Sequence, residues 1–181
     1  MPFTEFESRV SGIDGLNLIT TKQISDERGT IREFFRQSTY ASLLGSCGQI
    51  NITHSRQCAI RGLHGEDTTK LVGVAAGEAF GAYVDARPAS PTYGAVEVVQ
   101  LVLGLQVLVP RGVLNGFQSV SEGGCEYLYG FDTEWRPDMP GVGAYALDPG
   151  LAIPWPLAID TADRSMLSAK DAALPLFSAL D

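Results

Sequence analysis

The chain has 181 residues, of which 45% are hydrophobic and 19% are charged, a balance typical of a folded globular protein rather than a disordered one. This length suits a single domain, residues 1–181, with enough chain to bury a substantial core. The formal net charge of −8 argues against non-specific binding to nucleic acid, because a phosphate backbone needs clustered cations.

Short β-rich segments fill the middle of the chain, and Gly, Pro and Asp residues that favour turns separate them. Strands this short and this numerous predict an all-β fold, either an antiparallel sandwich or a jelly-roll barrel, whose closure protects the sheet edges. In chain order, the expected strands are 16–21, 48–53, 70–76, 78–86, 95–103, 105–110, 115–120 and 125–131.

A short helix is expected before the second of these strands. It covers residues 38–45, where Ser38 or Thr39 would be the N-cap and Gly45 would end the helix. Apolar spacing between the two ends also favours a helix.

A second short helix is expected at the end of the chain, over residues 168–181. Ser168 would be its N-cap, and Asp171 would lie in the first turn, where a carboxylate interacts favourably with the helix dipole. Pro175 limits this helix to a turn or two.

The cysteines and the apolar segments indicate the cellular compartment in which the protein works. The three cysteines are scattered and form no CxxC motif, which predicts buried thiols in a reducing compartment. Residues 1–12 carry acidic residues and no apolar core, unlike a secretory signal. The most apolar stretch, residues 96–110, is too short and too interrupted by Gln and Gly to span a bilayer. We therefore expect a cytoplasmic protein without a membrane or nucleic-acid partner.

The chain has two histidines, His54 and His64, and several chemistries can be tested against them. They stand ten residues apart without a third histidine, which does not suit a metal site, so we expect neither a metal nor another cofactor. A G-x-S-x-G motif and a glycine-rich phosphate loop are both absent from the sequence. With these chemistries excluded, the sequence favours a site that combines proton transfer with anion binding.

The segment around His64 supports that combination. In a regular strand Arg61 and Leu63 would share one face and His64 would take the other, whereas a bulge at Gly62 would bring Arg61 and His64 together. The sequence leaves these two arrangements open, and a buried structural histidine is a third. An arginine is costly to bury without a partner, so an anion in a pocket would explain why Arg61 accompanies His64.

Segments spread over most of residues 16–176 resemble the dTDP-4-dehydrorhamnose 3,5-epimerase family, in the same order and at nearly the same spacing. The resemblance implies a cupin-type jelly roll that forms a homodimer and inverts C-3, C-5 or both in a nucleotide-linked 4-keto-6-deoxy sugar, without a metal. The segments are DERGTIREFF (26–35), QIN (49–51), IRGLH (60–64), TKLV (69–72), GEAFGAYVDARPASPTYG (77–94), VPRGVLNGF (109–117), EYLYG (126–130), LDPGLAIPWP (147–156) and LSAKDAALPL (167–176).

The resemblance also implies roles for single residues. His64 matches the general base, Asp171 the carboxylate that pairs with it, Tyr129 the proton donor, and Lys70 the lysine beside the keto oxygen, where a cation would stabilise an enolate. The residues that match substrate-binding positions are Arg28 and Arg61, on the diphosphate, together with Glu33, Gln49, Asn51, Asn115 and Lys170. Taken alone, Asp171 would be a first-turn helix acid and Tyr129 a half-buried strand tyrosine that shares its face with Tyr127.

The chain departs from the family's pattern at several substrate-reading positions. Asn115 replaces a second histidine, Gly130 a lysine, and Pro140 a glutamate, and the loop after His64 is shorter. The base, the acid and the enolate lysine are retained, so we expect the epimerase chemistry to be kept, whereas the identity of the sugar is left open. Two alternatives stay open: a 3,4-ketoisomerase of similar fold, and a barrel that binds a sugar nucleotide without turnover.

Overall fold

Strands make up nearly all of the regular structure in the computed structural model of the protein, which describes residues 3–180. The helical elements are α1 (Gln37–Tyr40), α2 (Ala169–Ala172) and the 3-10 turn η1 (Phe177–Ala179). The strands are β1 (Phe3–Thr4), β2 (Glu7–Val10), β3 (Asn17–Thr20), β4 (Gln23–Asp26), β5 (Gly29–Arg32), β6 (Gln49–Ser55), β7 (Ile60–Glu66), β8 (Lys70–Ala76), β9 (Ala79–Asp85), β10 (Val96–Leu101), β11 (Leu105–Val109), β12 (Val113–Ser119), β13 (Cys125–Phe131) and β14 (Gly141–Gly143).

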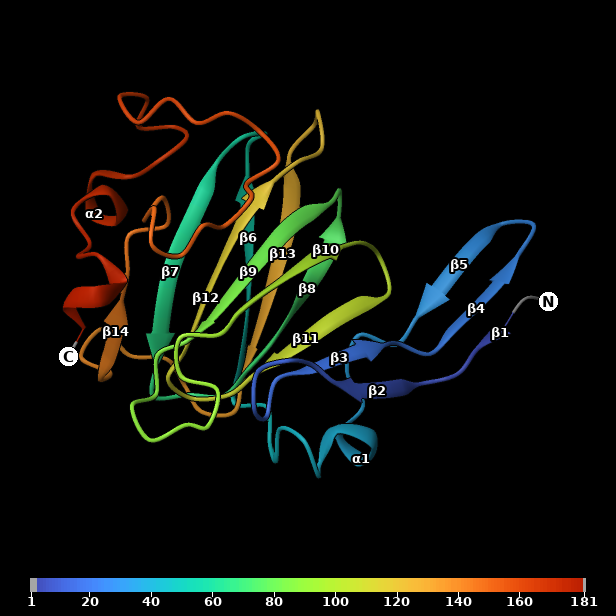
Figure 1. The fold of residues 1–181 in the computed structure, drawn as a ribbon. Coiled ribbons are helices and arrows are strands. Elements are labelled where there is room, and N and C mark those ends of the chain that lie inside the picture. The colour runs from blue at the N-terminus through green and yellow to red at the C-terminus, as the bar shows by residue number, and fades with distance from the viewer. Residues whose placement is uncertain (1–2, 181) are drawn as a thin grey trace.

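Two antiparallel sheets face each other and form the body of the molecule (Figure 1). One sheet has six strands in the order β2-β3-β11-β8-β13-β6, and the other has five in the order β10-β9-β12-β7-β14. A small third sheet, β1-β4-β5, projects from one side of the body as an arm. This arrangement confirms the expected all-β fold.

The main core lies between the two large sheets, and the alternation of side chains along each strand explains its composition. The six-stranded sheet contributes Val72 and Tyr127 to this core, and the five-stranded sheet contributes Tyr83 and Phe117. Phe117 and Tyr127 stack across the core with ring centroids 3.8 Å apart. Burial of such large side chains is the main stabilising term for this kind of sandwich.

Two further layers cover the outer faces of the sheets. The outer face of the five-stranded sheet, including Leu63 and Leu114, packs against the chain that follows β14, including Leu167. Tyr40 of α1 packs with Leu71 on the outer face of the six-stranded sheet. The C-terminal segment is thereby fixed against β7, which becomes important for the site.

The eight expected strands are all present, with ends shifted by a few residues at most. Strands β1, β2, β4, β5, β7 and β14 were not expected. Most of these are short and exposed, so they lack the alternating apolar pattern that identifies a strand. Strand β7 is the important omission, because it carries His64.

The expected helix over 38–45 is wrong in its length and its cap. Helix α1 covers Gln37–Tyr40, and Arg36 is its N-cap without a side-chain hydrogen bond. The chain continues from Tyr40 as turns and reaches Gly45 with a positive φ of 76°, as expected for the end of such a segment. A segment this short has little helical stability of its own and follows its packing against the sheet.

The expected helix over 168–181 is present as one turn. Ser168 caps it by accepting a hydrogen bond from the backbone N–H of Asp171, as the sequence indicates. The helix ends at Ala172, ahead of Pro175, and residue 181 lies outside the described residues.

Candidate active site

A cavity of about 230 Å³ opens between the two large sheets at one end of the sandwich. Both sheets contribute side chains that point inward along their strands, and the loop after β13 closes one side. The lining residues are Asn51, Thr53, Arg61, Gly62, His64, Glu66, Lys70, Asn115, Tyr129, Phe131 and Trp135. Six of the residues that the sequence singles out, namely Asn51, Arg61, His64, Lys70, Asn115 and Tyr129, meet in this one pocket.

A bulge in β7 explains why Arg61 and His64 both reach the pocket. On the neighbouring β12, Asn115 pairs with His64 and Phe117 with Arg61, so β7 holds one more residue than β12 over this interval. Gly62 lies in the bulge with φ of 109°, and a Cβ there would lie 2.7 Å from the backbone oxygen of Asn115. Only glycine fits this position, and the bulged arrangement is the one that the protein adopts.

His64 is paired with Asp171 from the far end of the chain. Its Nε2 lies 2.9 Å from Oδ1 of Asp171, and Asp171 is buried in the first turn of α2. Burial acts to raise the pKa of Asp171, but the hydrogen bond with His64 and the one with Ser168 outweigh it and hold this pKa below its usual range. Asp171 is therefore a carboxylate at neutral pH and can accept a hydrogen bond from Nε2–H of His64.

Lys70 lies at the start of β8 with its side chain almost fully buried in the pocket wall. Its Nζ donates a hydrogen bond to the backbone oxygen of His64 at 3.1 Å and forms an ion pair with the carboxylate of Glu66. Burial lowers the pKa of Lys70, whereas the charge of Glu66 and its hydrogen bond raise it, and the net shift is downward.

Tyr129 lies in the wall opposite His64, because β13 belongs to the six-stranded sheet and β7 to the five-stranded one. Its ring continues an inward-facing aromatic row, with Tyr127 at 4.8 Å and Phe131 at 6.0 Å between ring centroids. Tyr127 and Tyr129 thus share one face, as expected. Burial raises the pKa of Tyr129 well above its usual range, so the phenol keeps its proton at neutral pH.

Arg61 is oriented by β6, through hydrogen bonds from its guanidinium to Ser55 Oγ at 2.8 Å and to the backbone oxygen of His54 at 3.4 Å. Within residues 3–180 no carboxylate forms an ion pair with Arg61. A cation held by neutral groups at the edge of a pocket is suited to bind an anionic ligand.

A model of the dTDP-4-dehydrorhamnose 3,5-epimerase family matches residues 11–179 of the chain. The chain belongs to this family. It is therefore an enzyme of the isomerase class, as the sequence predicts, with the cupin-like β fold of the family. The non-catalytic barrel is correspondingly disfavoured.

Individual members of the epimerase family are similar over nearly the whole chain. The dTDP-4-dehydrorhamnose 3,5-epimerase of Salmonella typhimurium is 35% identical over 175 residues, 92% of each chain. The dTDP-4-dehydrorhamnose 3-epimerase of Streptomyces niveus is 32% identical over 157 residues, which cover 82% of this chain and 75% of that one. The crystal structure of the 3,5-epimerase RmlC from Legionella pneumophila, in complex with dTDP-4-keto-L-rhamnose, superposes with a TM-score of 0.86 at 34% identity, covering 98% and 95% of the two chains.

Asn115, which the resemblance places at the position of a second histidine, lines the pocket beside His64. Its amide nitrogen donates to the hydroxyl of Tyr127 at 3.3 Å. A neutral amide at this position can hydrogen-bond but cannot titrate, so the side chain next to His64 carries no charge.

Gln49 acts through its neighbours. Its amide nitrogen donates to Asn51 Oδ1 at 2.9 Å, and its amide oxygen accepts from the backbone N–H of Trp135 at the same distance. Gln49 thereby orients two residues that line the pocket of this epimerase-family chain.

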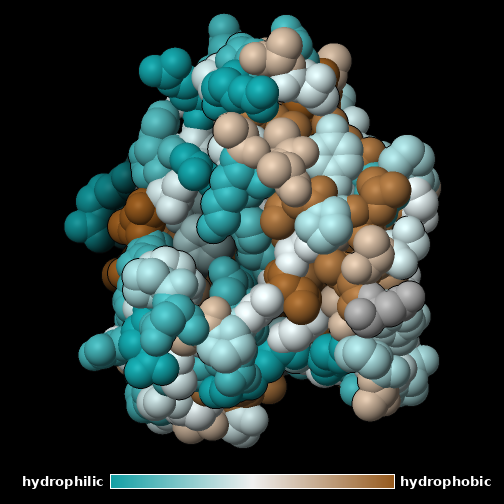
Figure 2. Space-filling view, turned by 90° about the vertical axis from the view of Figure 1, so that its left-hand side faces the viewer, coloured by the Kyte–Doolittle hydropathy of each residue, from teal (hydrophilic) through white to brown (hydrophobic). Residues whose placement is uncertain are grey.

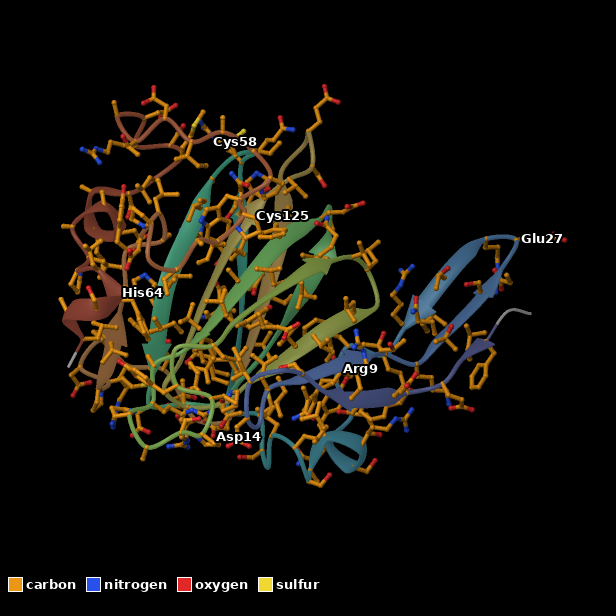
Figure 3. The ribbon with its side chains drawn as sticks, in the orientation of Figure 1. Arg9, Asp14, Glu27, Cys58, His64 and Cys125 are labelled. Atoms are coloured by element: carbon orange, nitrogen blue, oxygen red, sulfur yellow. The ribbon has the colours of Figure 1, made fainter. Side chains whose placement is uncertain are left out.

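Besides Gln49, three residues that the resemblance assigns to substrate binding do not line this pocket. Arg28 and Glu33 belong to the arm and to the segment that follows it, where they pair with Asp26 and Arg36. Glu27, next to Arg28, lies at the tip of the arm, and His64 lies on the opposite side of the molecule (Figure 3). Lys170 of α2 is exposed and does not line the cavity.

Some of the residues that line the pocket were not identified from the sequence. Glu66 follows His64 by two positions, so strand alternation would have placed it on the same face had β7 been recognised. Trp135 comes from the loop after β13 and has no periodic signal that could have identified it.

Two other features can be stated for residues 3–180. No group of three or more His, Cys, Asp or Glu side chains is placed to hold a metal ion, and the expectation of a metal-free site stays a prediction. None of the helices found there has the length and hydropathy needed to cross a membrane.

The surface near the C-terminal segment is mixed in polarity. On the side that carries α2 and β14, Figure 2 shows hydrophobic side chains gathered on one half of the face and hydrophilic ones on the other. Val142 of β14 and Leu176 after α2 are among the exposed apolar side chains of the protein.

Proposed function

We propose that the protein inverts C-3, C-5 or both in a nucleotide-linked 4-keto-6-deoxy sugar by proton transfer through an enolate. One observation carries this proposal: His64 and Tyr129 line opposite walls of a single pocket, with Lys70 in the same cavity. Inversion at carbon needs a base on one side of the ring and an acid on the other.

His64 is the base in this mechanism. The carboxylate of Asp171 holds the ring proton on Nε2, which leaves Nδ1 without a proton and able to accept one. The C-4 carbonyl acidifies the hydrogens on the neighbouring carbons. His64 takes one of these hydrogens as a proton, and the electron pair moves onto the carbonyl oxygen as an enolate. Asp171 then stabilises the imidazolium that forms.

Lys70 stabilises the enolate oxygen. A buried ammonium group interacts with developing negative charge more strongly than one in bulk water. The electron pair returns from the oxygen to carbon as the carbonyl re-forms, and the phenol of Tyr129 delivers a proton to the other face of the same carbon. Solvent then restores the protonation of both side chains.

The substrate class follows from the anion site and from the relatives. Arg61 supports binding of the diphosphate, and the Legionella pneumophila relative was crystallised with dTDP-4-keto-L-rhamnose. Relatives include both a 3,5-epimerase and a 3-epimerase, so the number of inverted carbons varies among similar chains. Asn115, Gly130 and Pro140 differ from the family's pattern at substrate-reading positions, which supports a changed preference among nucleotide-linked 4-keto sugars.

The test is incubation with dTDP-4-keto-6-deoxyglucose, followed by NMR analysis of the products. An epimerase gives 4-keto sugars inverted at C-3, C-5 or both. A product with its carbonyl moved to C-3 would instead establish the 3,4-ketoisomerase alternative. Recovery of unchanged substrate, without exchange at either carbon, would exclude this sugar, and the same assay would then be run with other nucleotide-linked 4-keto sugars.

The protein is also proposed to act as a homodimer. Arg28 lies on the projecting arm, away from the pocket of its own chain, so it can bind substrate only in the pocket of a second copy (Figures 1 and 3). Mixing the inactive variants His64→Ala and Arg28→Ala should restore part of the activity, because mixed dimers hold one intact site. Sedimentation as a monomer with full activity would contradict the dimer.

The three free thiols, Cys47, Cys58 and Cys125, support the further proposal that the protein works in the reducing cytoplasm.

A further inference from the structure

Glu66 is a carboxylate in the pocket to which the mechanism above gives no role. It follows His64 by two positions on β7, so both side chains are on the inward face of the strand, and both line the cavity. A carboxylate facing a site that binds an anionic substrate and forms an enolate is unfavourable unless a cation compensates it. Lys70 is that cation, since the two side chains form an ion pair.

The short connection between β7 and β8 brings the pair together. Only residues 67–69 separate Glu66 from Lys70, and this turn is tied to the chain beyond β13. Thr68 Oγ1 donates to Asp132 Oδ1 at 2.6 Å, and the backbone N–H of Asp132 donates to the backbone oxygen of Thr69 at 3.1 Å. The turn is thus held at both sides, which fixes the positions from which Glu66 and Lys70 face each other.

The contacts of the Lys70 ammonium group determine what it can offer a substrate. An ammonium group has three N–H donors. One donates to the backbone oxygen of His64, and the Glu66 carboxylate lies against the ammonium group as its ion-pair partner. Within residues 3–180 Lys70 Nζ has no other hydrogen-bond partner, so one donor is left for a group in the cavity.

We propose that Glu66 is a positioning residue that keeps the buried Lys70 protonated and directs its remaining N–H donor toward the enolate oxygen. This inference rests on the function proposed above and extends it to a residue without an assigned role. Glu66 does not touch the reacting carbon in this account. It acts through Lys70.

The charges around Lys70 are consistent with this role. Burial lowers the pKa of Lys70, and Glu66 is the charged group that opposes the effect. Glu66 also contributes to raising the pKa of Tyr129, which helps to keep the proposed acid protonated. The titratable groups that share the cavity with Lys70 are Arg61, His64, Glu66 and Tyr129, with Asp171 behind His64 and Asp132 beside the turn.

The direct test is an NMR titration of Lys70 without substrate, so that its outcome does not depend on the sugar. The chain has three lysines, Lys22, Lys70 and Lys170, and labelling of the lysine Cε atoms gives a spectrum that single Lys→Arg variants can assign. Glu66→Gln should lower the pKa of Lys70 by about one to three units, the usual effect of an adjacent opposite charge. Asp67→Asn is the matched control, because Asp67 is the neighbouring carboxylate but pairs with Arg111.

The expected result is a large downward shift in Glu66→Gln and a much smaller one in Asp67→Asn. An unchanged Lys70 pKa in Glu66→Gln would overturn the proposal, whatever the activity. If Glu66→Gln does not fold, Glu66→Ala removes the same charge and takes its place.

Turnover supplies a second readout once a substrate is in hand. Because Lys70 must be protonated, the alkaline limb of the kcat profile should move to lower pH in Glu66→Gln by the same shift as the Lys70 pKa. Glu66→Asp keeps the carboxylate and should return the alkaline limb part of the way to its wild-type pH. A uniform loss of kcat at every pH would indicate a merely structural role and would contradict the proposal.

Discussion

His64 and Asp171 are hydrogen-bonded at 2.9 Å although 107 residues separate them in the chain. The C-terminal segment makes this contact because it packs against the outer face of the five-stranded sheet and places α2 beside β7. Ser168 fixes the first turn of α2 from the other side. The pair is therefore assembled by the fold.

The first prediction concerns the charge of that carboxylate. Asp171→Asn keeps the shape of the side chain but removes the charge that stabilises a protonated His64, so kcat should fall by about 10²–10⁴-fold. KM should change little, because Asp171 lies behind His64 and does not line the cavity. Steady-state kinetics measure both constants. Asp163→Asn, in the exposed loop before α2, is the control, and wild-type kcat in Asp171→Asn would refute the pairing's role.

Removal of the phenol separates the two proton transfers. In Tyr129→Phe the base can still remove a proton and return one from solvent to the same face, so deuterium should enter the unreacted 4-keto sugar in D₂O. Inverted product should fall by about 10²–10⁴-fold. NMR follows both readouts in one sample. Loss of exchange together with inversion would show that Tyr129 does not act on the opposite face.

Gly62 should be intolerant of a side chain. In Gly62→Ala the new Cβ would clash with the backbone of β12 at a positive φ, which we expect to cost about 1–3 kcal/mol of unfolding free energy. The bulge would rearrange and separate Arg61 from His64, so activity should fall as well. Urea unfolding measures the first effect. Gly123→Ala, whose Cβ would meet nothing within 4 Å, should unfold like the wild type.

Asp85 should matter for stability rather than for catalysis. Its fully buried carboxylate accepts hydrogen bonds from Arg87 Nε at 2.8 Å, from Ser90 Oγ at 2.5 Å and from Thr92 Oγ1 at 2.6 Å, and it thereby ties the loop between β9 and β10. Asp85→Asn breaks the ion pair with Arg87 and should lower the unfolding free energy by about 3 kcal/mol at neutral pH.

The pH dependence of this effect has a definite sign. Burial acts to raise the pKa of Asp85, but its hydrogen bonds outweigh it and hold this pKa far below the usual value. The stabilisation is therefore complete above the unfolded-state pKa of about 3.9 and is lost as the pH falls further toward the folded-state value. Unfolding curves of wild type and Asp85→Asn should converge in strong acid. A gap that widened as the pH fell would contradict this assignment.

The sequence predicts the buried strands well because their apolar side chains alternate, as in Val72 and Val74 of β8. It does not predict β7, in which two glycines and several titratable residues hide the alternation. The pairing of His64 with Asp171 could be expected only from the family resemblance, because no local pattern links residues so far apart. The location of Arg28 could not be predicted from its match to the family motif. The match does not indicate that Arg28 lies on an arm that projects away from the pocket.

Hydrogen exchange at carbon tests the central claim most directly. In D₂O with dTDP-4-keto-6-deoxyglucose, the wild-type protein should introduce deuterium at C-3, C-5 or both. His64→Ala, with its fold verified by circular dichroism, should reduce the exchange rate by about 10²–10⁴-fold. Exchange at the wild-type rate in His64→Ala would contradict the assignment of His64 as the base.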